Sequence, residues 1–474
     1  MDKERMKPIE ITIKHKKNQL IGRIAQVAIF LPFKVVEVNM LLTDDTYFLI
    51  FYKDDFVYGD RLEKVSAGSF IDLAFQKGIV LPSHHPFLPV MIPHKSTTIP
   101  NGQTLFSKLQ ARYSLLEMAY LATTFDSFIT KDQLIKTMDK IYFHYRRNGS
   151  FFKAYQILRV LMNFSPEYHS AHERLQAQKF SSYMKWYHTS PLSLIYEKDP
   201  LFVELYNFNN RMNPEVYEPY IHLLNEHGRS VELLLLWMEK VAMGQETDSF
   251  DHYTSLALQF VSMEGWMAVL TDINVNPFQR FPEAKKVIQK MMSEKRYESA
   301  ASYLFRFIDD LPASYEDLLN DLWLHLDPEF AAAHLDDVLS VLQKLASRAE
   351  LGSFEQTLLL LTRKLLQSNS LPAVYEKLKP IHELIPNSPV LKKLKRMMLL
   401  IEDPDHMMEL GQYYAEFKQF DEAIECFAWE MELHPEDSAP VRELSKMYHF
   451  KGMDEEASAY QQIYTQIKKD QGVG

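Results

Sequence analysis

The chain has 474 residues, of which 46% are hydrophobic and 24% are charged, and this balance is typical of a folded protein rather than a disordered one. Its formal net charge of -11 argues against a general nucleic-acid-binding protein, because neutralising phosphates requires a basic surface. Cys426 is the only cysteine, which excludes an intramolecular disulfide and a cysteine-based zinc cluster and favours a reducing compartment.

The start of the chain predicts neither a signal peptide nor a membrane anchor. MDKERMKPIEITIKHKK lacks the apolar core and the small-residue cleavage site of a signal peptide. No later apolar run is long enough to span a bilayer. We therefore expect a cytoplasmic protein that is not inserted in a membrane.

Residues 1–100 are predicted to form a small β-containing domain of the α+β class. Isoleucines alternate with polar residues over 9–14, which is the two-residue period of a strand with one buried face. Two β-rich runs, 35–42 and 46–52, flank the polar step Thr43-Asp44-Asp45 and predict a hairpin. A short helix is expected near SFIDLAF.

The segment LPSHHPFLPVMIPH, residues 81–94, contains four prolines in fourteen positions. Proline removes a backbone donor and disrupts helix interiors and central strands, so we expect neither element here. This composition predicts a domain boundary between about residue 90 and about residue 105.

From residue 105 to residue 474 the apolar residues recur three and four positions apart, which predicts amphipathic helices. Pairs such as Asn148-Gly149 and His227-Gly228, and prolines such as Pro166 and Pro386, interrupt this pattern at short intervals. The region should therefore consist of paired short helices.

One stretch, 404–437, shows the spacing behind these pairs most clearly. Counted from Pro404, six residues fall at positions 7, 8, 11, 20, 24 and 32, namely Leu410, Gly411, Tyr414, Ala423, Phe427 and Pro435. This spacing resembles the tetratricopeptide repeat, a helical hairpin of about 34 residues. Two antiparallel helices should approach most closely at Gly411 and Ala423, because only small side chains fit there.

The same frame recurs in 281–314 and 135–168, and in a degenerate form in 355–388 and 438–470. The resemblance implies a mostly α fold, in which a tetratricopeptide-like α-solenoid of helical hairpins over 105–474 follows the small N-terminal domain. The intervals between the clear units are not multiples of the repeat length. The number of repeats between residues 169 and 280 is therefore left open.

The resemblance also implies a binding face, because the first helix of each unit supplies ligand contacts at positions 2, 5, 9, 12 and 13. Basic and histidine side chains occupy several of these positions: Lys136, Arg146, Arg147, Lys285, Arg363, Arg442, Lys446 and His449. They predict a protein partner or an acidic peptide as the ligand. The alternative is an ordinary solvated helix face. No unit carries Asn at position 9, so the family's carboxylate clamp is not reproduced.

No motif indicates catalysis or a cofactor. The chain lacks GxxxxGK[ST], GxGxxG, HExxH and GxSxG. His169 and His172 share a helix face without a marked third ligand, and three further histidines lie in the proline-rich segment, namely His84, His85 and His94. Cys426 is predicted to be a packed helix residue rather than a nucleophile. We expect no enzyme activity, no metal and no cofactor.

The leading hypothesis is a non-catalytic scaffold that binds a protein or peptide on the concave face of the solenoid. The alternative is a peptide-responsive regulatory protein whose N-terminal domain acts on a target. A third reading, an enzyme housed in the N-terminal domain, requires a pocket with converging polar groups. The partner and the oligomeric state stay open.

Overall fold

The computed structural model describes residues 9–15, 18–245, 249–327 and 351–471, together with residues 330, 333–334, 336–338 and 340. The chain divides into two compact units, Lys3–Val275 and Asn276–Gly474, which we call the N-terminal and the C-terminal unit. Strands lie only near the start of the described chain and helices make up most of the rest, so the predicted fold class is confirmed. A domain boundary near residue 100 stays a prediction.

One mixed sheet opens the N-terminal unit, with strands in the order β5-β4-β3-β2-β1-β7 and with β6 paired to β2. β7 runs parallel to β1, and the other pairs are antiparallel. The strands are β1 (Glu10–His15), β2 (Asn18–Phe30), β3 (Phe33–Met40), β4 (Thr46–Tyr52), β5 (Asp55–Arg61), β6 (Ile79–Pro82) and β7 (Ser96–Thr98). The predicted hairpin at residues 43–45 is confirmed, since β3 and β4 are antiparallel neighbours on either side of it.

The long strand β2 organises this sheet. An irregularity between Ile24 and Gln26 shifts its register against β3, and such bulges bend a strand. β2 thereby pairs with β1, β3 and β6 along its length. Six of the seven residues of β4 are buried, so both faces of the sheet are covered there.

The expectation that residues 81–94 contain no helix is wrong, whereas the exclusion of a central strand agrees with the structure. β6 extends to Pro82 and, among the described strands, pairs with β2 alone. Such an edge position tolerates a proline, because one side of the strand needs no backbone donor. The four-residue helix α2 (Leu88–Met91) carries Pro89 in its first turn, where the missing N–H has no helical acceptor. α1 (Phe70–Lys77) is the short helix expected near SFIDLAF.

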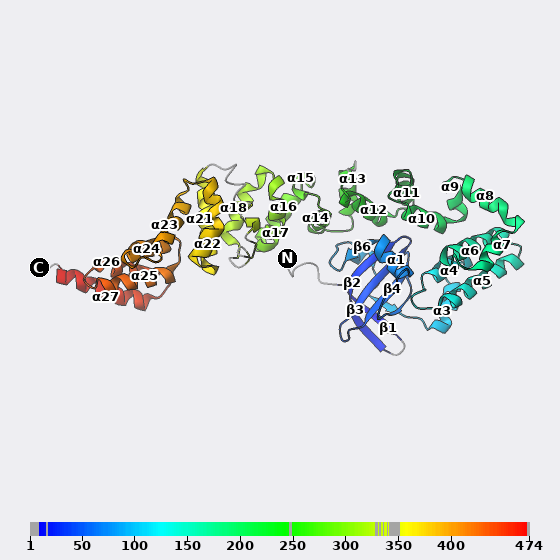
Figure 1. The fold of residues 1–474 in the computed structure, drawn as a ribbon, viewed down its shortest axis with the longest axis horizontal. Helices are drawn as coiled ribbons and strands as arrows, with labels where there is room; N and C mark the ends of the chain where they lie inside the picture. Colours follow the sequence, from blue (N-terminus) through cyan, green and yellow to red (C-terminus); the bar gives the residue numbers. More distant parts are fainter. Residues whose placement is uncertain are drawn as a thin grey trace. The chain divides into compact units, whose positions relative to one another are not determined.

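The helices of the N-terminal unit follow one another in an arc, and the sheet lies on the inner side of this arc (Figure 1). They are α3 (Gly102–Gln110), α4 (Leu115–Thr123), α5 (Lys131–Arg147), α6 (Phe151–Phe164), α7 (His169–Leu175), the 3-10 turn Gln178–Phe180, α8 (Ser181–Thr189), α9 (Leu192–Lys198), α10 (Pro200–Asn209), α11 (Pro214–Glu226), α12 (Ser230–Ala242), α13 (Phe250–Ala257) and α14 (Met263–Asp272).

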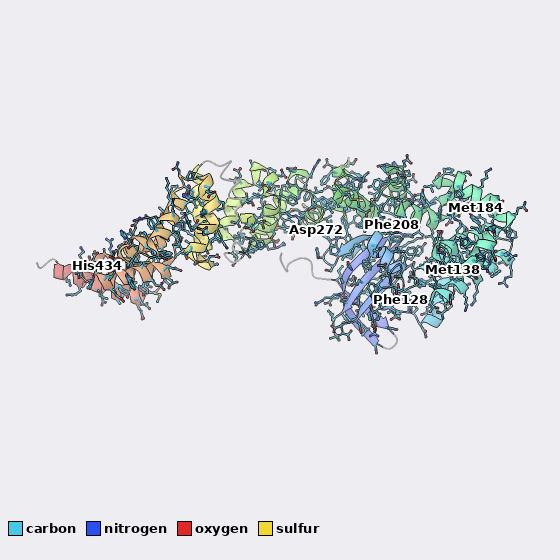
Figure 2. All side chains as sticks on the ribbon, viewed as in Figure 1. Phe128, Met138, Met184, Phe208, Asp272 and His434 are labelled. Atoms are coloured by element: carbon cyan, nitrogen blue, oxygen red, sulfur yellow. The ribbon has the colours of Figure 1, made fainter. Side chains whose placement is uncertain are left out.

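Aromatic side chains join the sheet to the helices at two places along the arc, at α10 and between α4 and α5. Phe30 of β2 meets Phe208 of α10 with ring centroids 5.2 Å apart. Tyr58 of β5 packs on Phe125 and Phe128, which lie between α4 and α5, at 5.6 and 5.4 Å. Phe208 and Phe128 are labelled in Figure 2. Because such rings bury large apolar areas, the sheet serves as the core around which this array is built.

The C-terminal unit consists of helices that pack mainly on their neighbours in sequence. They are α15 (Pro277–Arg280), α16 (Ala284–Ser293), α17 (Tyr297–Arg306), the 3-10 turns Ile308–Asp310 and Ala313–Tyr315, α18 (Glu316–His325), α21 (Leu351–Ser368), α22 (Leu371–Leu384), α23 (Pro389–Leu400), the 3-10 turn Pro404–His406, α24 (Met407–Glu416), α25 (Phe420–Leu433), α26 (Ser438–Phe450) and α27 (Asp454–Gln471). This is the arrangement of a helical-repeat protein.

A left-handed residue recurs at one position of the repeat frame. Gly149, Lys295, Lys418 and Gly452 have φ values of 70, 61, 60 and 74°, and each is the fifteenth residue of its frame, between the two helices of a hairpin. Gly228, with φ 65°, occupies the same turn between α11 and α12. This indicates a further unit beginning near Pro214, within the interval in which the sequence left the number of repeats open.

The close approach expected at Gly411 is present in the hairpin of α24 and α25. A Cβ atom on Gly411 would lie 2.6 Å from a ring carbon of Phe427, which is fully buried. Real Cβ atoms do not come this close to another carbon, so only glycine fits without a shift of the ring. Ala423 is likewise fully buried in this hairpin.

Candidate functional site

Helix α5 carries three of the predicted binding residues on its exposed side. Lys136, Arg146 and Arg147 are all exposed. The opposite side of the helix is buried and apolar, with residues Leu134, Ile135, Met138, Ile141, Tyr142 and Tyr145. The amphipathic pattern that folds α5 onto its neighbours therefore directs its basic residues toward solvent.

Two further residues lie on this face of α5, and neither was among the predicted binding residues. Lys140 is exposed, and Phe143 keeps 36% of its surface accessible. With Lys136 and Arg147 they follow a spacing of four, three and four residues, so all four lie on one stripe of the helix. We call Lys136, Lys140, Phe143 and Arg147 the α5 stripe. Lys140 was not predicted because this residue lies next to, and not at, one of the family's ligand positions. The helical period would have identified it, since Lys140 lies one turn after Lys136.

No acidic side chain is ion-paired with the lysines or with Arg147 of this stripe in the part of the chain that the structure describes. The nearby Asp139 accepts from the Arg174 guanidinium at 2.6 Å and from the Tyr168 hydroxyl at 2.6 Å, so its charge is already used. Arg147 Nε donates to the carbonyl oxygen of Phe143 at 3.2 Å. Apart from Asp132, which lies one turn before Lys136, the α5 stripe thus presents positive charge that no described acid pairs with.

On α26 the predicted cations have a different setting. Arg442 and Lys446 both donate to the Glu443 carboxylate, at 2.9 and 2.8 Å, and Glu443 is only 14% exposed. His449 lies 3.3 Å from Asp454. The structure therefore brings Arg442 and Lys446 together, but around an acid that cancels part of their charge.

The two remaining predicted residues, Arg363 and Lys285, donate hydrogen bonds to backbone carbonyl oxygens. Arg363 donates to the carbonyl oxygen of Glu416, at 2.8 Å from Nη2, at the carboxyl end of α24. Lys285 Nζ donates to the carbonyl oxygen of Ser314 at 2.7 Å. Both side chains satisfy carbonyls at turns and helix ends, which is a structural task. The predicted residues are therefore spread over several helices and the structure does not gather them into one site.

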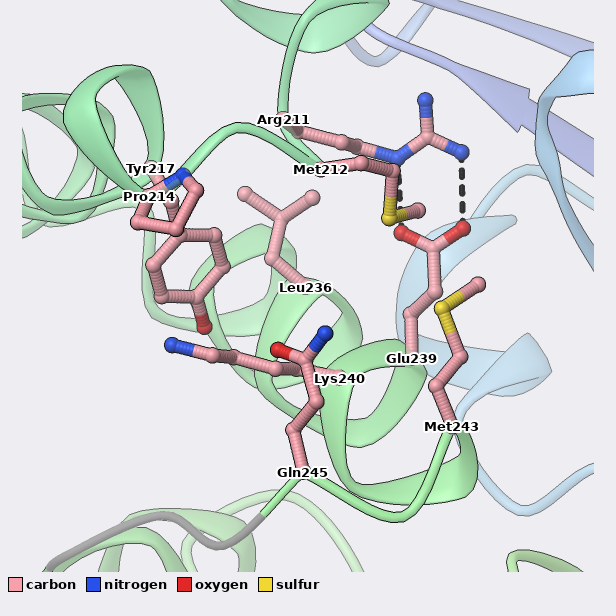
Figure 3. A pocket seen from close by; sticks show the side chains of 9 residues that line it. All are labelled: Arg211, Met212, Pro214, Tyr217, Leu236, Glu239, Lys240, Met243 and Gln245. Atoms are coloured by element: carbon pink, nitrogen blue, oxygen red, sulfur yellow. Dashed lines mark hydrogen bonds and ion pairs between the residues drawn. The ribbon is translucent and has the colours of Figure 1, made fainter.

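The inner side of the N-terminal arc is occupied by an ion pair and by the sheet. Figure 3 shows the Arg211 guanidinium facing the Glu239 carboxylate, with Nε and Nη2 at 2.6 and 2.7 Å from its oxygens. Arg211 also donates to the carbonyl oxygens of Phe208 and Lys77, each at 2.8 Å. One side chain thus joins α1, α10 and α12.

The shallow pocket beside this ion pair has a mixed lining. Its residues are Arg211, Met212, Pro214, Tyr217, Leu236, Glu239, Lys240, Met243 and Gln245. Lys240 Nζ lies 4.1 Å from the centre of the Tyr217 ring, and Met212 and Met243 stand exposed at the rim. Arg211 is paired with Glu239 and Lys240 lies over the Tyr217 ring, so these groups contact one another. The pocket lies outside residues 1–100 and does not test the hypothesis of an enzyme in that domain.

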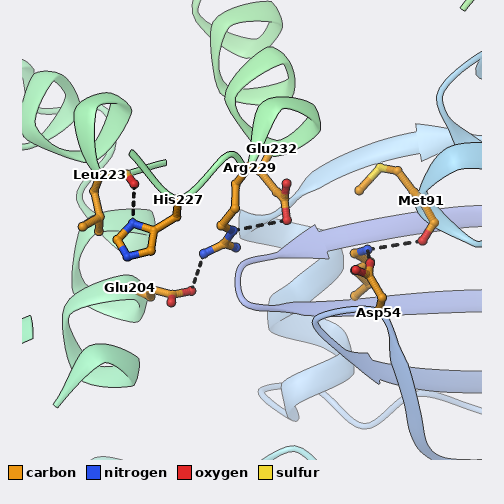
Figure 4. A network of polar contacts seen from close by, with 8 residues as sticks. Asp54, Met91, Glu204, Leu223, His227, Arg229 and Glu232 are labelled. Carbon is orange, nitrogen blue, oxygen red and sulfur yellow. Dashed lines mark hydrogen bonds and ion pairs between the residues drawn. The ribbon is translucent and has the colours of Figure 1, made fainter. Parts of the chain in front are cut away.

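A second charged network lies where α10 and the α11–α12 turn approach the sheet (Figure 4). Arg229 donates to Glu204 at 2.8 Å and lies 3.4 Å from Glu232. Burial disfavours the charge on Arg229, but the two carboxylates outweigh this effect and raise its pKa. On the sheet side Lys34 Nζ contacts Asp54 at 2.8 Å. The largely buried charges of Lys34, Arg229 and Glu204 are thus paired within the chain.

Two of the residues weighed for catalysis or metal binding, Cys426 and His85, are packed in the interior, whereas His169 and His94 are exposed. Burial, with smaller contributions from Glu425 and Glu422, raises the pKa of the Cys426 thiol to about 11, so the thiol stays protonated. His85 is buried and stacks on Phe87. Within the described ranges, no group of three His, Cys, Asp or Glu side chains is placed to hold a metal ion. Among the described helices, none has the length and apolar character needed to cross a bilayer.

Comparison with known proteins adds little to this geometry. No family model matches the chain, and no curated protein matches it. Among solved structures, the chain is similar to one described as a crystal structure of MamA, with 13% identity over 40% of this chain and 98% of the other, and a TM-score of 0.15. A TM-score this low supports no conclusion about fold or function, so the helical-repeat architecture rests on the hairpins described above.

Proposed function

We propose that this protein is a non-catalytic scaffold of tetratricopeptide-like hairpins that binds an acidic segment of a protein partner on the α5 stripe. The observation that carries the proposal is the row of exposed cations on the first helix of a repeat-like hairpin, which form no ion pair with any acid that the structure describes. A row of this kind attracts carboxylates and orients an extended chain along the helix. We place this activity in the cytoplasm, in keeping with the single cysteine.

The geometry of the stripe suits a short acidic segment. From Lys136 to Arg147 the helix rises about 16 Å, which is the span of about five extended residues. Phe143 lies between the cations and offers an apolar contact to a side chain of the ligand. Arg146 flanks the stripe and extends its positive charge.

The α26 cations are the weaker candidate. Glu443 sits between Arg442 and Lys446 and reduces the net charge that a ligand meets there. An acidic ligand would have to compete with this carboxylate for the same donors. We therefore assign the acidic segment to α5 rather than to α26.

A direct test is the binding of a fluorescent acidic peptide to the full chain, followed by anisotropy. Lys136→Glu with Lys140→Glu should weaken binding at least tenfold, because two attractive contacts become repulsive. Binding should also weaken as salt is raised, since exposed charges are screened. A peptide in which glutamine replaces each glutamate serves as the ligand control.

The matched protein control is Arg442→Glu with Lys446→Glu, which reverses two similarly exposed cations on α26. We expect it to leave the affinity within about twofold of the unmodified chain. Equal losses in both variants would show that the peptide senses only overall charge. Loss in the α26 variant alone would move the site to α26 and contradict the assignment to α5.

The second candidate, a peptide-responsive regulator, is favoured by the contacts between the sheet and the helices that surround it. Because Arg211 joins Lys77 to α10 and α12, a shift of these helices on ligand binding would move α1 against the sheet. Small-angle scattering with and without the acidic peptide tests this candidate. An unchanged profile at saturation would leave the scaffold as the function.

A further inference from the structure

Helix α25 presents large apolar side chains to solvent on the side away from its hairpin partner. Trp429 and Leu433 keep 51% and 49% of their surfaces exposed and lie one turn apart. Glu422, Glu425 and Glu432 are exposed on the same side of the helix. Among the ion pairs of the described residues, none involves these three glutamates. We call these five residues the α25 face.

This face has the composition of a binding surface rather than of a solvated helix side. The packing of α25 is supplied by its other side, where Ala423, Cys426 and Phe427 are buried. An exposed tryptophan is therefore not needed for the hairpin to fold. A tryptophan and a leucine bordered by charged residues match the apolar centre and polar rim of a protein interface.

The chain carries a complementary face on α23. Lys392, Lys395 and Leu399 are exposed on one side of this helix, and Leu399 keeps 67% of its surface accessible. Within the described residues, the Lys395 side chain makes no polar contact, and Lys392 donates only to the Asn387 side chain. α23 lies between the repeat frames 355–388 and 404–437 and interrupts their register. We call these three residues the α23 face.

The spacing of the two faces is the same. Glu422, Glu425 and Trp429 are separated by three and then four residues, as are Lys392, Lys395 and Leu399. When two helices with these faces lie parallel, both glutamates meet lysines and the tryptophan meets the leucine. An antiparallel arrangement would keep only Glu425 near Lys395 and would place Glu422 against Leu399 and Trp429 against Lys392. The match therefore selects one orientation.

We propose that this protein associates with a second copy of itself by packing the α25 face of one protomer parallel to the α23 face of the other. The opposite charges and the shared spacing identify the occupant as a second copy. Both faces are exposed within the same unit of one protomer, so they are available to a second one. Two reciprocal contacts close a dimer, and single contacts extend a chain of protomers.

This association is expected to be weak, because a single pair of helices buries less surface than a standard interface. We expect dissociation constants on the order of micromolar and a decrease in affinity at high salt. The proposal is independent of the α5 stripe. Variants on α23 and α25 should therefore bind the acidic peptide as the unmodified chain does.

The test is sedimentation velocity of the full chain over a series of concentrations, with two charge-reversed variants. The first is Glu422→Lys with Glu425→Lys, and the second is Lys392→Glu with Lys395→Glu. Each variant alone places like charges against each other, so its association should weaken at least tenfold. An equal mixture of the two restores opposite charges and should associate like the unmodified chain. Circular dichroism and thermal melting check that both variants fold.

The mixture makes the proposal falsifiable even if one substitution affects stability. Restored association in the mixture supports the pairing of the two faces. Association of each variant by itself, or a mixture no better than its components, overturns it. If the unmodified chain stays monomeric up to about 100 μM, the α25 face serves a different partner and the proposal of self-association is wrong.

Discussion

The two units of this chain use the same kind of helix in different ways. In the N-terminal unit the helices surround a sheet, and contacts such as that of Arg211 with the carbonyl oxygen of Lys77 join residues 134 positions apart in the sequence. In the C-terminal unit most contacts join one helix to the next, as in the hairpins of α24 with α25 and of α26 with α27. The N-terminal unit is thus organised around a central sheet, whereas the C-terminal unit is a stack of consecutive hairpins.

This difference predicts different responses to mutation. A linear array is stabilised by each hairpin and by the contact of that hairpin with its neighbours, so damage stays local. A unit built around a shared sheet loses contacts at several helices when one central residue is removed. It also has less free surface, because its own strands cover the inner side of the helices (Figure 1).

The largest effect is expected for Arg211→Ala, which removes the side chain that joins three helices. Glu239, only 14% exposed, would keep a charge without a partner, and two backbone carbonyls would lose a donor. Breaking a buried pair in this way costs about 3–5 kcal/mol. Urea unfolding of the full chain, followed by a probe in the N-terminal unit, should show this loss.

Arg23→Ala is the control in the same unit, because the pair of Arg23 with Glu10 is exposed at both ends. Its removal should cost less than about 1 kcal/mol. Equal effects of the two substitutions would contradict the view that the N-terminal unit is organised around its interior contacts.

Acid should weaken the N-terminal unit through His85. Burial, with a smaller effect of His84, lowers the pKa of His85 from 6.5 to about 4, so the folded chain holds this ring neutral. The unfolded chain binds a proton at a higher pH than the folded chain does. Stability should therefore fall as the pH drops from about 6.5 to about 4, by about 3 kcal/mol in total.

Unfolding in urea at several pH values measures this dependence, with His85→Gln as the comparison. The variant should lose this part of the acid sensitivity, because its amide does not titrate. A pH profile shared by the variant and the unmodified chain would assign the sensitivity to other groups.

The sequence predicted the fold where local rules decide it. Alternation marked β1, and the spacing of small and aromatic residues around Gly411 marked the hairpin of α24 and α25. It did not predict that the sheet fills the inner side of the first helices, because Phe30 and Phe208 are 178 positions apart and no periodicity links them. It left the unit near Pro214 open, because the signal of this unit is the left-handed Gly228 rather than the usual apolar positions.

The candidate site was predicted in part, for a similar reason. Frame positions identified exposed residues such as Lys136, since exposure follows from the helical period. The frame positions did not show which cations already donate hydrogen bonds within the chain. Arg363 donates to a carbonyl oxygen 53 positions later, and Lys285 donates to one 29 positions later. Such contacts depend on how hairpins stack.

A smaller effect, of opposite sign in the two units, is expected for two helical glycines. Gly411→Ala should destabilise the C-terminal unit by about 1–2 kcal/mol, because the added Cβ forces the buried Phe427 ring to move. Gly265→Ala in α14 places its Cβ 3.4 Å from the nearest atoms, and the better helix propensity of alanine should then stabilise by up to about 1 kcal/mol. Thermal melting of both variants checks the signs.

The smallest effect on stability, and the sharpest comparison of the two cationic faces, is expected for Glu443→Gln. Its partners Arg442 and Lys446 are half exposed, so losing both contacts should cost less than about 1 kcal/mol. The substitution leaves α26 with two cations and no acid between them, which resembles the charge of the α5 stripe. In a chain that also carries Lys136→Glu and Lys140→Glu, it should restore part of the lost affinity for the acidic peptide, measured by anisotropy. If affinity does not return, then uncompensated charge alone is not enough, and the row of cations with Phe143 on α5 is what the ligand requires.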